Sequence, residues 1–266
     1  MNKIAGKIIV FWLYLGYLVK ARHRKGHGIH SPYVFEMVTK VFFDKTKYAD
    51  YDLFINIRKK LSDCDTKLQV ETLGAKSGFF NTDERMVHDL VRISSVKPKF
   101  GKLLYRLVKY YRPSTIVELG TSIGLSTIYL AKGNPEAKVI TAEGSSALCE
   151  FAKKTFLENK FTNILVKQGM FDDFLDELSE EIFKSVVVFI DGNHQYNSIL
   201  HYFNFFAERM TEGIIVLDDI HWSRGMNRAW REITRRESSQ ACIDLFGMGI
   251  VILRQGITRQ NYTIKF

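Results

Sequence analysis

The sequence predicts an α/β fold, in which a doubly wound, mostly parallel sheet follows a helical N-terminal extension and ends in an antiparallel hairpin. The first observation is that Ile116–Ala131 reads as a strand, a tight glycine turn and a helix. The second is that predicted strands and helices alternate from Thr115 onward, which is the pattern of a parallel sheet with helices on both faces. The third is a pair of apolar runs, 241–246 and 249–254, joined by a turn short enough for a hairpin.

The N-terminal leader combines an apolar run with a strong positive charge. Ile8–Val19 carries no charged residue, and residues 1–30 contain six Lys or Arg and no Asp or Glu. The run is shorter than the ~20 residues of a membrane-spanning helix. A signal peptide is disfavoured because no small-residue cleavage site follows and the basic cluster opposes translocation. Two interpretations remain: a helix in the membrane interface, which Trp12 and the basic residues suit, and a helix that docks on the domain or on a second copy of the chain.

Several helices are expected between the leader and the sheet. Their expected bounds are 32–43, 49–62, 82–94 and 100–111. Ser31 and Pro32 have the residue types of an N-cap and a first helical position. Asn81 with Glu84 predicts a capping box for the third helix. The intervening Glu71–Phe80 is rich in small residues and is interpreted either as a lid over an active site or as a plain connector.

The second part of the chain supplies the sheet. Strands are expected at 115–119, 138–143, 163–168, 185–191 and 213–218, and helices at 124–132, 145–158, 171–179, 195–210 and 225–236. Ile116 and Val117 of the first strand are β-branched, which is typical of a buried parallel strand. After the hairpin, a last strand is expected at 261–265. We therefore expect a helical extension at 1–94 and the main domain at 95–266.

Charge and cysteine content limit the partners and the compartment. The net charge is +9, but outside residues 1–30 only 32 Lys or Arg face 29 Asp or Glu. A nucleic-acid-binding domain needs a basic stripe on its folded surface, and we identify none in the sequence, so nucleic acid is not an expected partner. Cys64, Cys149 and Cys242 are odd in number and form no C-x-x-C pair, which predicts free thiols in a reducing, cytoplasmic compartment.

The glycine turn indicates which kind of ligand the sheet binds. Dinucleotide-binding enzymes use G-x-G-x-x-G, with the pyrophosphate at the helix N-terminus. This chain has G-x-x-x-G, with Gly120 and Gly124, and Glu118 ends the strand before it. An acid at that position suits a ligand with an ammonium group. The missing third glycine argues against an NAD-dependent oxidoreductase.

With this stretch, E-L-G-T-S-I-G-L-S, the sequence resembles the class I S-adenosylmethionine-dependent methyltransferases, and in particular the catechol-type O-methyltransferase branch, which has E-[IL]-G-x-x-x-G-x-S. Ser122 replaces the middle glycine of the commoner methyltransferase loop, as it does in that branch. The resemblance covers about residues 95–266. It implies the Rossmann-like methyltransferase fold, S-adenosylmethionine as cofactor, and O-methylation of a small-molecule acceptor. The alternative is a catalytically silent methyltransferase-like scaffold at the membrane surface.

The resemblance also implies a set of cofactor-binding residues. These are Glu118, Gly120, Thr121, Ser122, Gly124, Ser126, Glu143, Gly169, Met170, Phe171, Asp172 and Asp191. Glu143 ends the second strand, where an acid accepts both ribose hydroxyls in family members; the alternative is a surface glutamate. Gly169, Met170 and Phe171 resemble the segment that lines the adenine, and Asp172 is placed to accept from its amine.

Three aspartates and two histidines follow the fourth and fifth strands. Asp191, Asp218 and Asp219 lie at neighbouring strand ends, where they would repel one another unless a cation such as Mg²⁺ lay between them. The catechol-type enzymes hold a cation with acid, acid and amide at the matching positions, so Asp219 departs from their pattern. The alternative is that an aspartate contacts the cofactor or caps the next helix. His194 is the expected base for the acceptor hydroxyl, with Asp191 or His221 as competitors.

Overall fold

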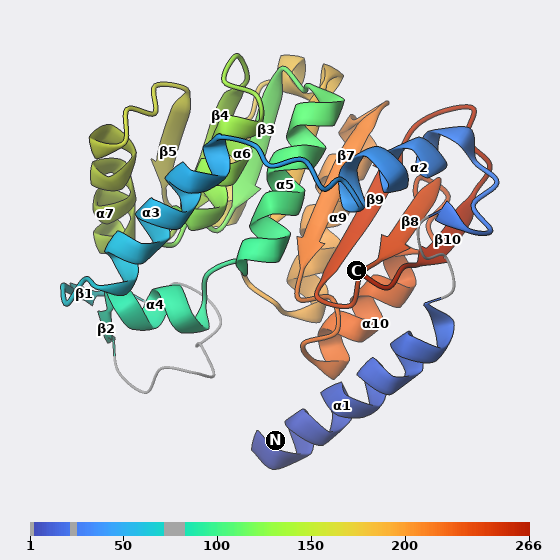
Figure 1. Ribbon diagram of the computed structural model, residues 1–266, viewed down its shortest axis with the longest axis horizontal. Helices are drawn as coiled ribbons and strands as arrows, with labels where there is room; N and C mark the ends of the chain where they lie inside the picture. Colours follow the sequence, from blue (N-terminus) through green and yellow to red (C-terminus); the bar gives the residue numbers. More distant parts are fainter. Residues whose placement is uncertain (1–2, 22–25, 72–82) are drawn as a thin grey trace. The chain divides into compact units, whose positions relative to one another are not determined.

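The computed structural model describes residues 3–21, 26–71 and 83–266 (Figure 1). The chain forms two compact units, one of Lys45–Ser179 and one of Met1–Asp44 with Glu180–Phe266. These units divide the chain differently from the expected boundary at residue 94. Both contribute strands to one eight-stranded, mostly parallel sheet, so the predicted fold class is confirmed.

The unit Lys45–Ser179 contains three parallel strands in the order β3-β4-β5. The strands are β3 (Thr115–Leu119), β4 (Lys138–Glu143) and β5 (Ile164–Gln168), and the helices are α3 (Asp50–Ser62), α4 (Val87–Ile93), α5 (Pro98–Tyr111), α6 (Leu125–Gly133), α7 (Ser146–Glu158) and α8 (Phe171–Asp176). Every residue of β3 is buried. Helices α5 and α6 pack closely, because a Cβ on Gly101 would lie 2.3 Å from the ring of Tyr129. This packing fixes the helix that begins directly after the glycine turn.

The other unit carries five strands in the order β10-β8-β9-β7-β6. The strands are β6 (Val186–Ile190), β7 (Gly213–Asp218), β8 (Ala241–Asp244), β9 (Met248–Leu253) and β10 (Gln260–Thr263), and the helices are α1 (Lys3–Lys20), α2 (Pro32–Met37), a π-helical turn (Val38–Phe42), a 3₁₀ turn (Glu180–Lys184), α9 (Tyr196–Arg209) and α10 (Arg224–Ile233). Strand β9 is antiparallel to both β7 and β8, which confirms the predicted hairpin. Trp230 is buried and lies against Gly249, where a Cβ would be 2.7 Å from the indole ring.

One expected helix starts later than the sequence predicts. Residues 84–86 form the short strand β2 (Glu84–Met86), which pairs antiparallel with β1 (Lys67–Gln69), and α4 begins only at Val87. The ion pair between Lys67 and Glu84, at 2.8 Å, joins the two strands and uses the side chain that was expected to cap the helix. The prediction of a helix from residue 82 was therefore wrong. Asn81 and all but the first residue of the expected lid lie outside the described residues.

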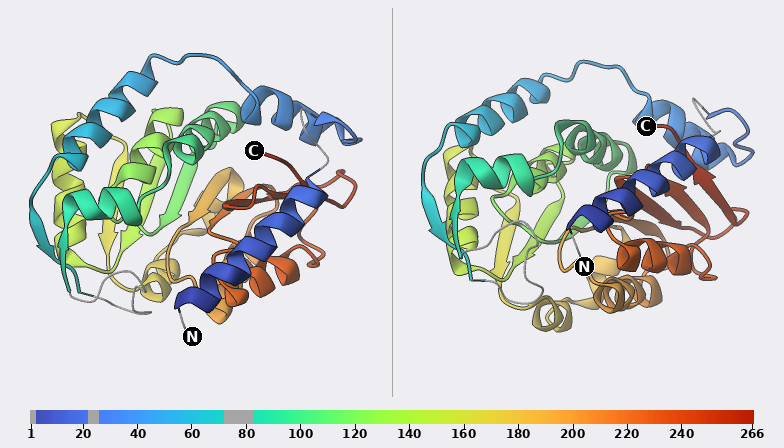
Figure 2. Two further views of the ribbon diagram at one scale, coloured as in Figure 1. Left: turned by 60° about the horizontal axis from the view of Figure 1, so that its bottom comes forward. Right: turned by 90° about the horizontal axis from the view of Figure 1, so that it is seen from below.

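Helix α1 packs on the C-terminal end of its own unit. Tyr17 is buried, its hydroxyl donates to the carbonyl of Ile264, and it accepts from the backbone N–H of Phe266 at 3.3 Å. Burial raises the pKa of Tyr17 to about 12. Figures 1 and 2 show α1 running beside α10. Among the described residues, no helix combines the length and the apolar character needed to cross a bilayer.

Candidate functional site

The glycine turn after β3 is held in a conformation that glycine favours. Gly120, Ser122 and Gly124 all have positive φ, at 108°, 49° and 85°. A Cβ on Gly124 would lie 2.5 Å from the ring of Phe156, so both the backbone and the packing require glycine there. The N–H of Gly120 donates to the carbonyl of Ala142 at 2.9 Å. The turn is thereby tied to the end of β4.

Glu118 is a fully buried carboxylate with one oxygen satisfied and one open. Its Oε2 accepts from the hydroxyls of Thr127 at 2.5 Å and Thr141 at 2.7 Å, and Thr141 in turn contacts Thr121 at 2.6 Å. Its Oε1 has no partner with ordinary hydrogen-bond geometry among the described residues, although Ser126 is close enough to lower the pKa. Burial raises the pKa of Glu118 to about 7. A half-satisfied buried carboxylate favours a ligand that brings donors or positive charge.

Glu143, at the end of β4, is held by backbone amides. Its Oε2 accepts from the N–H of Ser122 at 2.9 Å, and its Oε1 accepts from the N–H of Ser145 at 3.0 Å. Burial raises the pKa of Glu143, and the amides and Arg85 oppose that shift. Each carboxylate oxygen accepts more than one hydrogen bond. The partly exposed carboxylate therefore has acceptor capacity left for a pair of hydroxyls.

The segment that follows β5 is hydrogen-bonded to Glu143 at the end of β4. The N–H of Gly169 donates to the carbonyl of Glu143 at 3.0 Å, and φ of Gly169 is 146° with open space where a Cβ would be. Met170 is 42% exposed, Asp172 is exposed, and Phe171 is half-buried at the start of α8. Met170, which directly follows the glycine bonded to Glu143, provides an exposed apolar surface for a flat ring.

A second cluster lies in the other unit, at the ends of β6 and β7. Asp191 and Asp218 follow the paired residues Ile190 and Leu217. The Nε2 of His194 lies 3.6 Å from Oδ1 of Asp191. Burial, followed by the charges of Asp191 and Asp219, raises the pKa of Asp218 well above its ordinary value, while His194 opposes the shift. Protonation of Asp218 is therefore favoured, because it removes one of the negative charges that repel one another.

These aspartates do not form a set of metal ligands as they are arranged. Among residues 3–21, 26–71 and 83–266, no three or more His, Cys, Asp or Glu side chains are grouped so that they could hold a metal ion. The N–H of Asp219 donates to the carbonyl of Gly247 at 2.8 Å, and its φ is 52°. Hard cations need several oxygen ligands around one point, which this arrangement does not provide.

His194 and His221, the two histidines predicted as candidate bases, have different surroundings. His221 is buried; its Nε2–H donates to Asp244 at 2.8 Å and its Nδ1 accepts from Asn227 at 2.6 Å. Both ring nitrogens of His221 are therefore occupied. By contrast, Nδ1 of His194 has no hydrogen-bond partner within the described part of the chain. Of these two histidines, His194 is the one with a ring nitrogen that makes no hydrogen bond within the described residues.

The sequence did not point to the hydroxyls that hold Glu118. Thr127 and Thr141 are buried, and each directs its hydroxyl at the carboxylate. The sequence offers little to indicate this role: one threonine lies in the first turn of an apolar helix, and the other lies in the middle of a buried strand. Nothing in their spacing indicates that both hydroxyls reach one residue nine and 23 positions earlier.

Comparison with known proteins relates the chain to methyltransferases. Residues 117–220 match the family model described as a methyltransferase domain. A segment of 106 residues, 40% of the chain, is 28% identical to a transmembrane O-methyltransferase homolog of Mus musculus, of which it covers 37%. A segment of 89 residues, 33% of the chain, is 34% identical to a catechol O-methyltransferase of Niastella koreensis, of which it covers 40%. The matches thus span less than half of these relatives' own length.

Solved structures resemble the fold more completely. An O-methyltransferase from Bacillus cereus in complex with S-adenosylhomocysteine superposes with a TM-score of 0.54 and 19% identity, over 83% of this chain and 97% of that one. The O-methyltransferase TomG from Streptomyces achromogenes, in complex with S-adenosylmethionine, gives a TM-score of 0.52 and 20% identity, over 60% of this chain and 82% of that one. At these identities the likeness concerns the fold.

Proposed function

We propose that this chain, a member of the class I S-adenosylmethionine-dependent methyltransferases of the catechol O-methyltransferase-like branch, methylates a hydroxyl group of a small molecule. The observation that carries the proposal is the buried Glu118 carboxylate with its open Oε1, beside a turn that contains three residues of positive φ. Residues 95–266 carry the reaction in this proposal, and residues 1–94 form an extension.

The described residues fit S-adenosylmethionine by their donor and acceptor chemistry. Glu118 Oε1 would accept from the ammonium group of the methionine moiety, and Glu143 from the two ribose hydroxyls. Met170 and Phe171 would line the adenine, with Asp172 accepting from its amine. The remaining predicted contacts with the cofactor would come from the glycine turn and two residues near it: Gly120, Thr121, Ser122, Gly124, Ser126 and Gly169. When bound, the cofactor supplies a methyl group that is transferred to a nucleophile.

His194 is proposed to take the proton from the acceptor hydroxyl. Its Nδ1 has no partner among the described residues, and its Nε2 lies 3.6 Å from Asp191. The Asp191 carboxylate would hold the ring in place and stabilise the imidazolium that forms. His221 is not given this role because Asp244 and Asn227 occupy both of its ring nitrogens.

Mg²⁺ enters the proposal as a condition to be tested. The family resemblance implies a cation held by Asp191, Asp218 and Asp219. Binding it would require Asp218 to lose its proton and the three carboxylates to converge, because the described residues contain no such ligand group. No step above depends on the ion.

Calorimetry with S-adenosylhomocysteine tests the cofactor assignment. The wild-type chain should bind it, and Glu143→Ala should bind more weakly with its folding intact. A methyl-transfer screen over phenols, sugars and small acids, with and without Mg²⁺, then identifies the acceptor. Tight binding of NAD in place of S-adenosylhomocysteine would refute the assignment. We also propose that the enzyme works in the cytoplasm, at the inner face of the membrane.

A further inference from the structure

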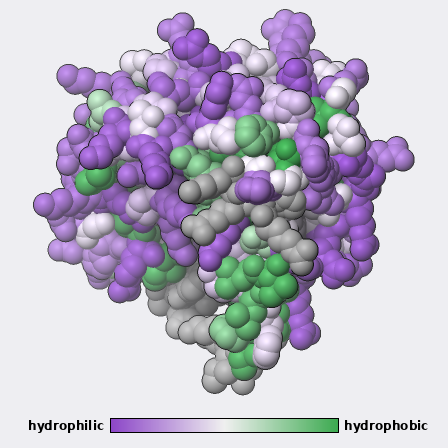
Figure 3. Space-filling view, turned by 45° about the vertical axis from the view of Figure 1, so that its right-hand side comes forward, coloured by the Kyte–Doolittle hydropathy of each residue, from purple (hydrophilic) through white to green (hydrophobic). Residues whose placement is uncertain are grey.

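Helix α1 has one packed face and one bare apolar face. Tyr14 and Tyr17 lie against Phe246, with ring centroids 4.9 and 5.3 Å apart. Five large apolar residues of α1 are exposed instead: Ile8, Phe11, Trp12, Leu15 and Val19. Their spacing of three and four positions places them along one side of the helix. This α1 strip appears low in Figure 3 as a hydrophobic patch.

The α1 strip is too extensive to be incidental surface. Trp12 is 65% exposed and Val19 is 72% exposed, at opposite ends of the row. Single exposed apolar residues are ordinary, whereas a contiguous row of five marks a surface that binds something. The row contains both an aromatic residue of the type that favours a membrane interface and aliphatic residues that favour acyl chains.

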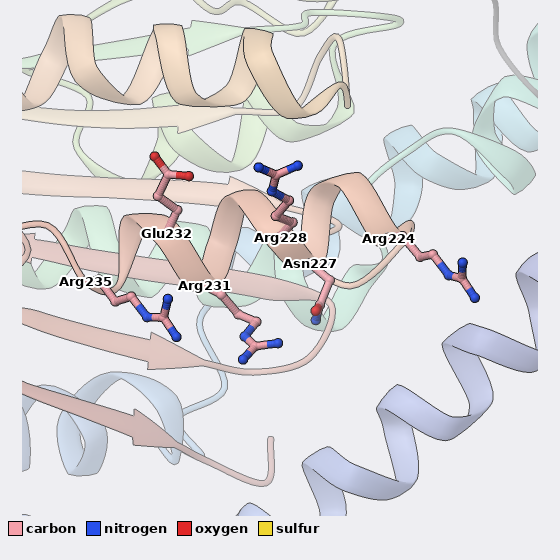
Figure 4. Close-up of a pocket in the computed structure, with 6 residues that line it drawn as sticks. All are labelled: Arg224, Asn227, Arg228, Arg231, Glu232 and Arg235. Carbon is pink, nitrogen blue, oxygen red and sulfur yellow. The ribbon is translucent and has the colours of Figure 1, made fainter.

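A row of arginines lies along α10 and the turn that follows it. Arg224, Arg228, Arg231 and Arg235 are exposed and follow one another at four, three and four positions. They line a groove of about 540 Å³ together with Asn227 and Glu232. In Figure 4, Arg231 and Arg235 point to one side of α10, and Arg224 extends from its N-terminal end in the direction of α1. We call this feature the α10 arginine groove.

The positive charge of the groove is not balanced by its lining. The acid of the lining, Glu232, already accepts from the hydroxyl of Tyr196 at 2.6 Å and pairs with Arg236 at 2.8 Å. The guanidinium of Arg228 lies 4.4 Å from the centre of the Tyr196 ring. Several guanidinium groups are therefore left to bind anions, and guanidinium groups bind phosphate oxygens in a bidentate manner.

A chain of side-chain contacts joins the groove to the packed face of α1. Asn227, which lines the groove, donates to His221, and the ring of His221 lies 5.1 Å from that of Phe246. Phe246 contacts Tyr14 and Tyr17 of α1. Since Figures 1 and 2 also show α1 beside α10, the α1 strip and the α10 arginine groove belong to one region of the same unit.

We propose that the α1 strip and the α10 arginine groove together dock the protein on an anionic phospholipid bilayer. The strip enters the boundary between headgroups and acyl chains, and the arginines bind the lipid phosphates. The inference rests on the proposed location at the membrane and is independent of methyl transfer.

The charges and the apolar row together favour an anionic bilayer over a second copy of the chain and over a nucleic acid. A second copy of the chain would bring together two leaders that each carry six basic residues and no acid within residues 1–30. A nucleic acid would match the arginines but would leave Phe11, Trp12 and Val19 in water. A bilayer with anionic headgroups provides a partner for the apolar row and for the cations at once.

Vesicle co-sedimentation of the full-length protein tests the proposal at low salt. The protein should sediment with phosphatidylcholine vesicles that contain phosphatidylglycerol, and much less with phosphatidylcholine alone. Trp12→Ser should weaken binding about tenfold or more. The double variant Arg231→Gln with Arg235→Gln should weaken it about 25-fold, because each cation near an anionic surface contributes about a fivefold factor. Trp12→Phe should retain binding but lose the fluorescence blue shift that the vesicles cause.

Matched control variants distinguish binding through this surface from non-specific binding through other exposed apolar or basic residues. Leu157 is 79% exposed on α7, and Arg92 is exposed on α4, so Leu157→Ser and Arg92→Gln should sediment like the wild type. All variants should keep their thermal midpoint and their affinity for S-adenosylhomocysteine, which distinguishes failure here from failure of the proposed function. The proposal is overturned if the full-length protein does not sediment with anionic vesicles, or if the arginine double variant sediments like the wild type. It is also overturned if Trp12→Ser disrupts a dimer and leaves vesicle binding unchanged, or if the protein binds polynucleotides but not vesicles.

Discussion

The hydroxyl of Thr127 donates to Oε2 of Glu118 at 2.5 Å, while the other oxygen of the same buried carboxylate has no partner among the described residues. Burial holds the pKa of Glu118 at about 7, so near neutral pH a large fraction of the carboxyl groups carries a proton. A ligand with an ammonium group needs the ionised form. If Glu118 binds the ammonium group of the cofactor, as proposed, then cofactor binding and proton release are coupled at this residue.

Binding of S-adenosylhomocysteine is expected to release protons. Bound ammonium would lower the pKa of Glu118 below its value of about 7 in the free protein, so affinity should fall as the pH drops below about 7 and level off above it. Calorimetry in buffers of different ionisation enthalpy measures the protons released. Glu118→Gln should bind weakly and release none from this group. A binding enthalpy that is independent of the buffer near pH 7 would contradict the coupling.

Removing a hydroxyl beneath Glu118 should cost stability and shift the pH dependence. Thr127→Val and Thr141→Val each take one donor from Oε2, which leaves a buried carboxylate less satisfied, at a cost of about 1–3 kcal/mol in the free energy of unfolding. The pH at which cofactor affinity falls should move upward, since the ionised form loses a donor. Thr155→Val is the matched control, because the hydroxyl of Thr155 bonds to a backbone carbonyl within α7. Urea titrations at two pH values measure the effect.

Gly124→Ala should destabilise the fold by about 2 kcal/mol or more. The substitution forces a Cβ onto φ of 85° and to within 2.5 Å of the Phe156 ring. Phe156→Leu in the same chain should relieve the clash without removing the backbone strain, so the double variant should recover part of the loss. Gly225→Ala, on α10 with its nearest contact at 3.6 Å, should be neutral or stabilising. Equal thermal midpoints for the two alanine variants would be inconsistent with this account.

His194→Ala and His221→Ala should fail in different ways. Loss of a general base costs ~10²–10⁴ in rate, so His194→Ala should lower kcat with the affinity for S-adenosylhomocysteine unchanged. His221→Ala should instead lower stability, because Asp244 and Asn227 lose a buried partner. Single-turnover rates and urea midpoints of both variants separate these outcomes. A fully active His194→Ala enzyme would move the role of base to Asp191.

Asp218→Asn distinguishes a protonated aspartate from a metal ligand. The amide mimics a neutral carboxylic acid in size, so the variant should keep or gain stability as the repulsion from Asp191 and Asp219 disappears. If a divalent cation is required, activity should vanish in excess EDTA, and Asp218→Asn should raise the Mg²⁺ concentration needed for half-maximal rate. Full activity in EDTA would show that Mg²⁺ has no part in the reaction.

The sheet could be predicted because its signals are local. β3, β4 and β7 have the expected bounds, since each has a buried, mostly apolar centre and lies between clear turns. The helix expected from residue 82 failed for the opposite reason: a capping pattern was visible locally, but Glu84 pairs with Lys67, seventeen positions away. Sequence reasoning does not reveal such a pairing when the strands are only three residues long.

The sequence indicates candidate residues for the site, but it does not indicate their hydrogen bonds or their pKa values. Glu118 was predicted from the glycine motif and Glu143 from its place at the end of the second strand, whereas the buried hydroxyls and the raised pKa of Glu118 depend on residues far along the chain. His194 and His221 look alike in sequence, and only Asp244 and Asn227 separate them. The basic row of α10 was not expected from the sequence, because the nearly balanced charge of the main domain obscures four arginines at helical spacing.

The bond between the hydroxyl of Tyr17 and the N–H of Phe266 joins residues 249 positions apart. During synthesis, residues 3–20 are made long before residues 264–266, on which they pack. Both faces of the apolar helix are therefore open while the residues in between are translated. In that interval its apolar side chains are exposed to any chaperone or bilayer nearby.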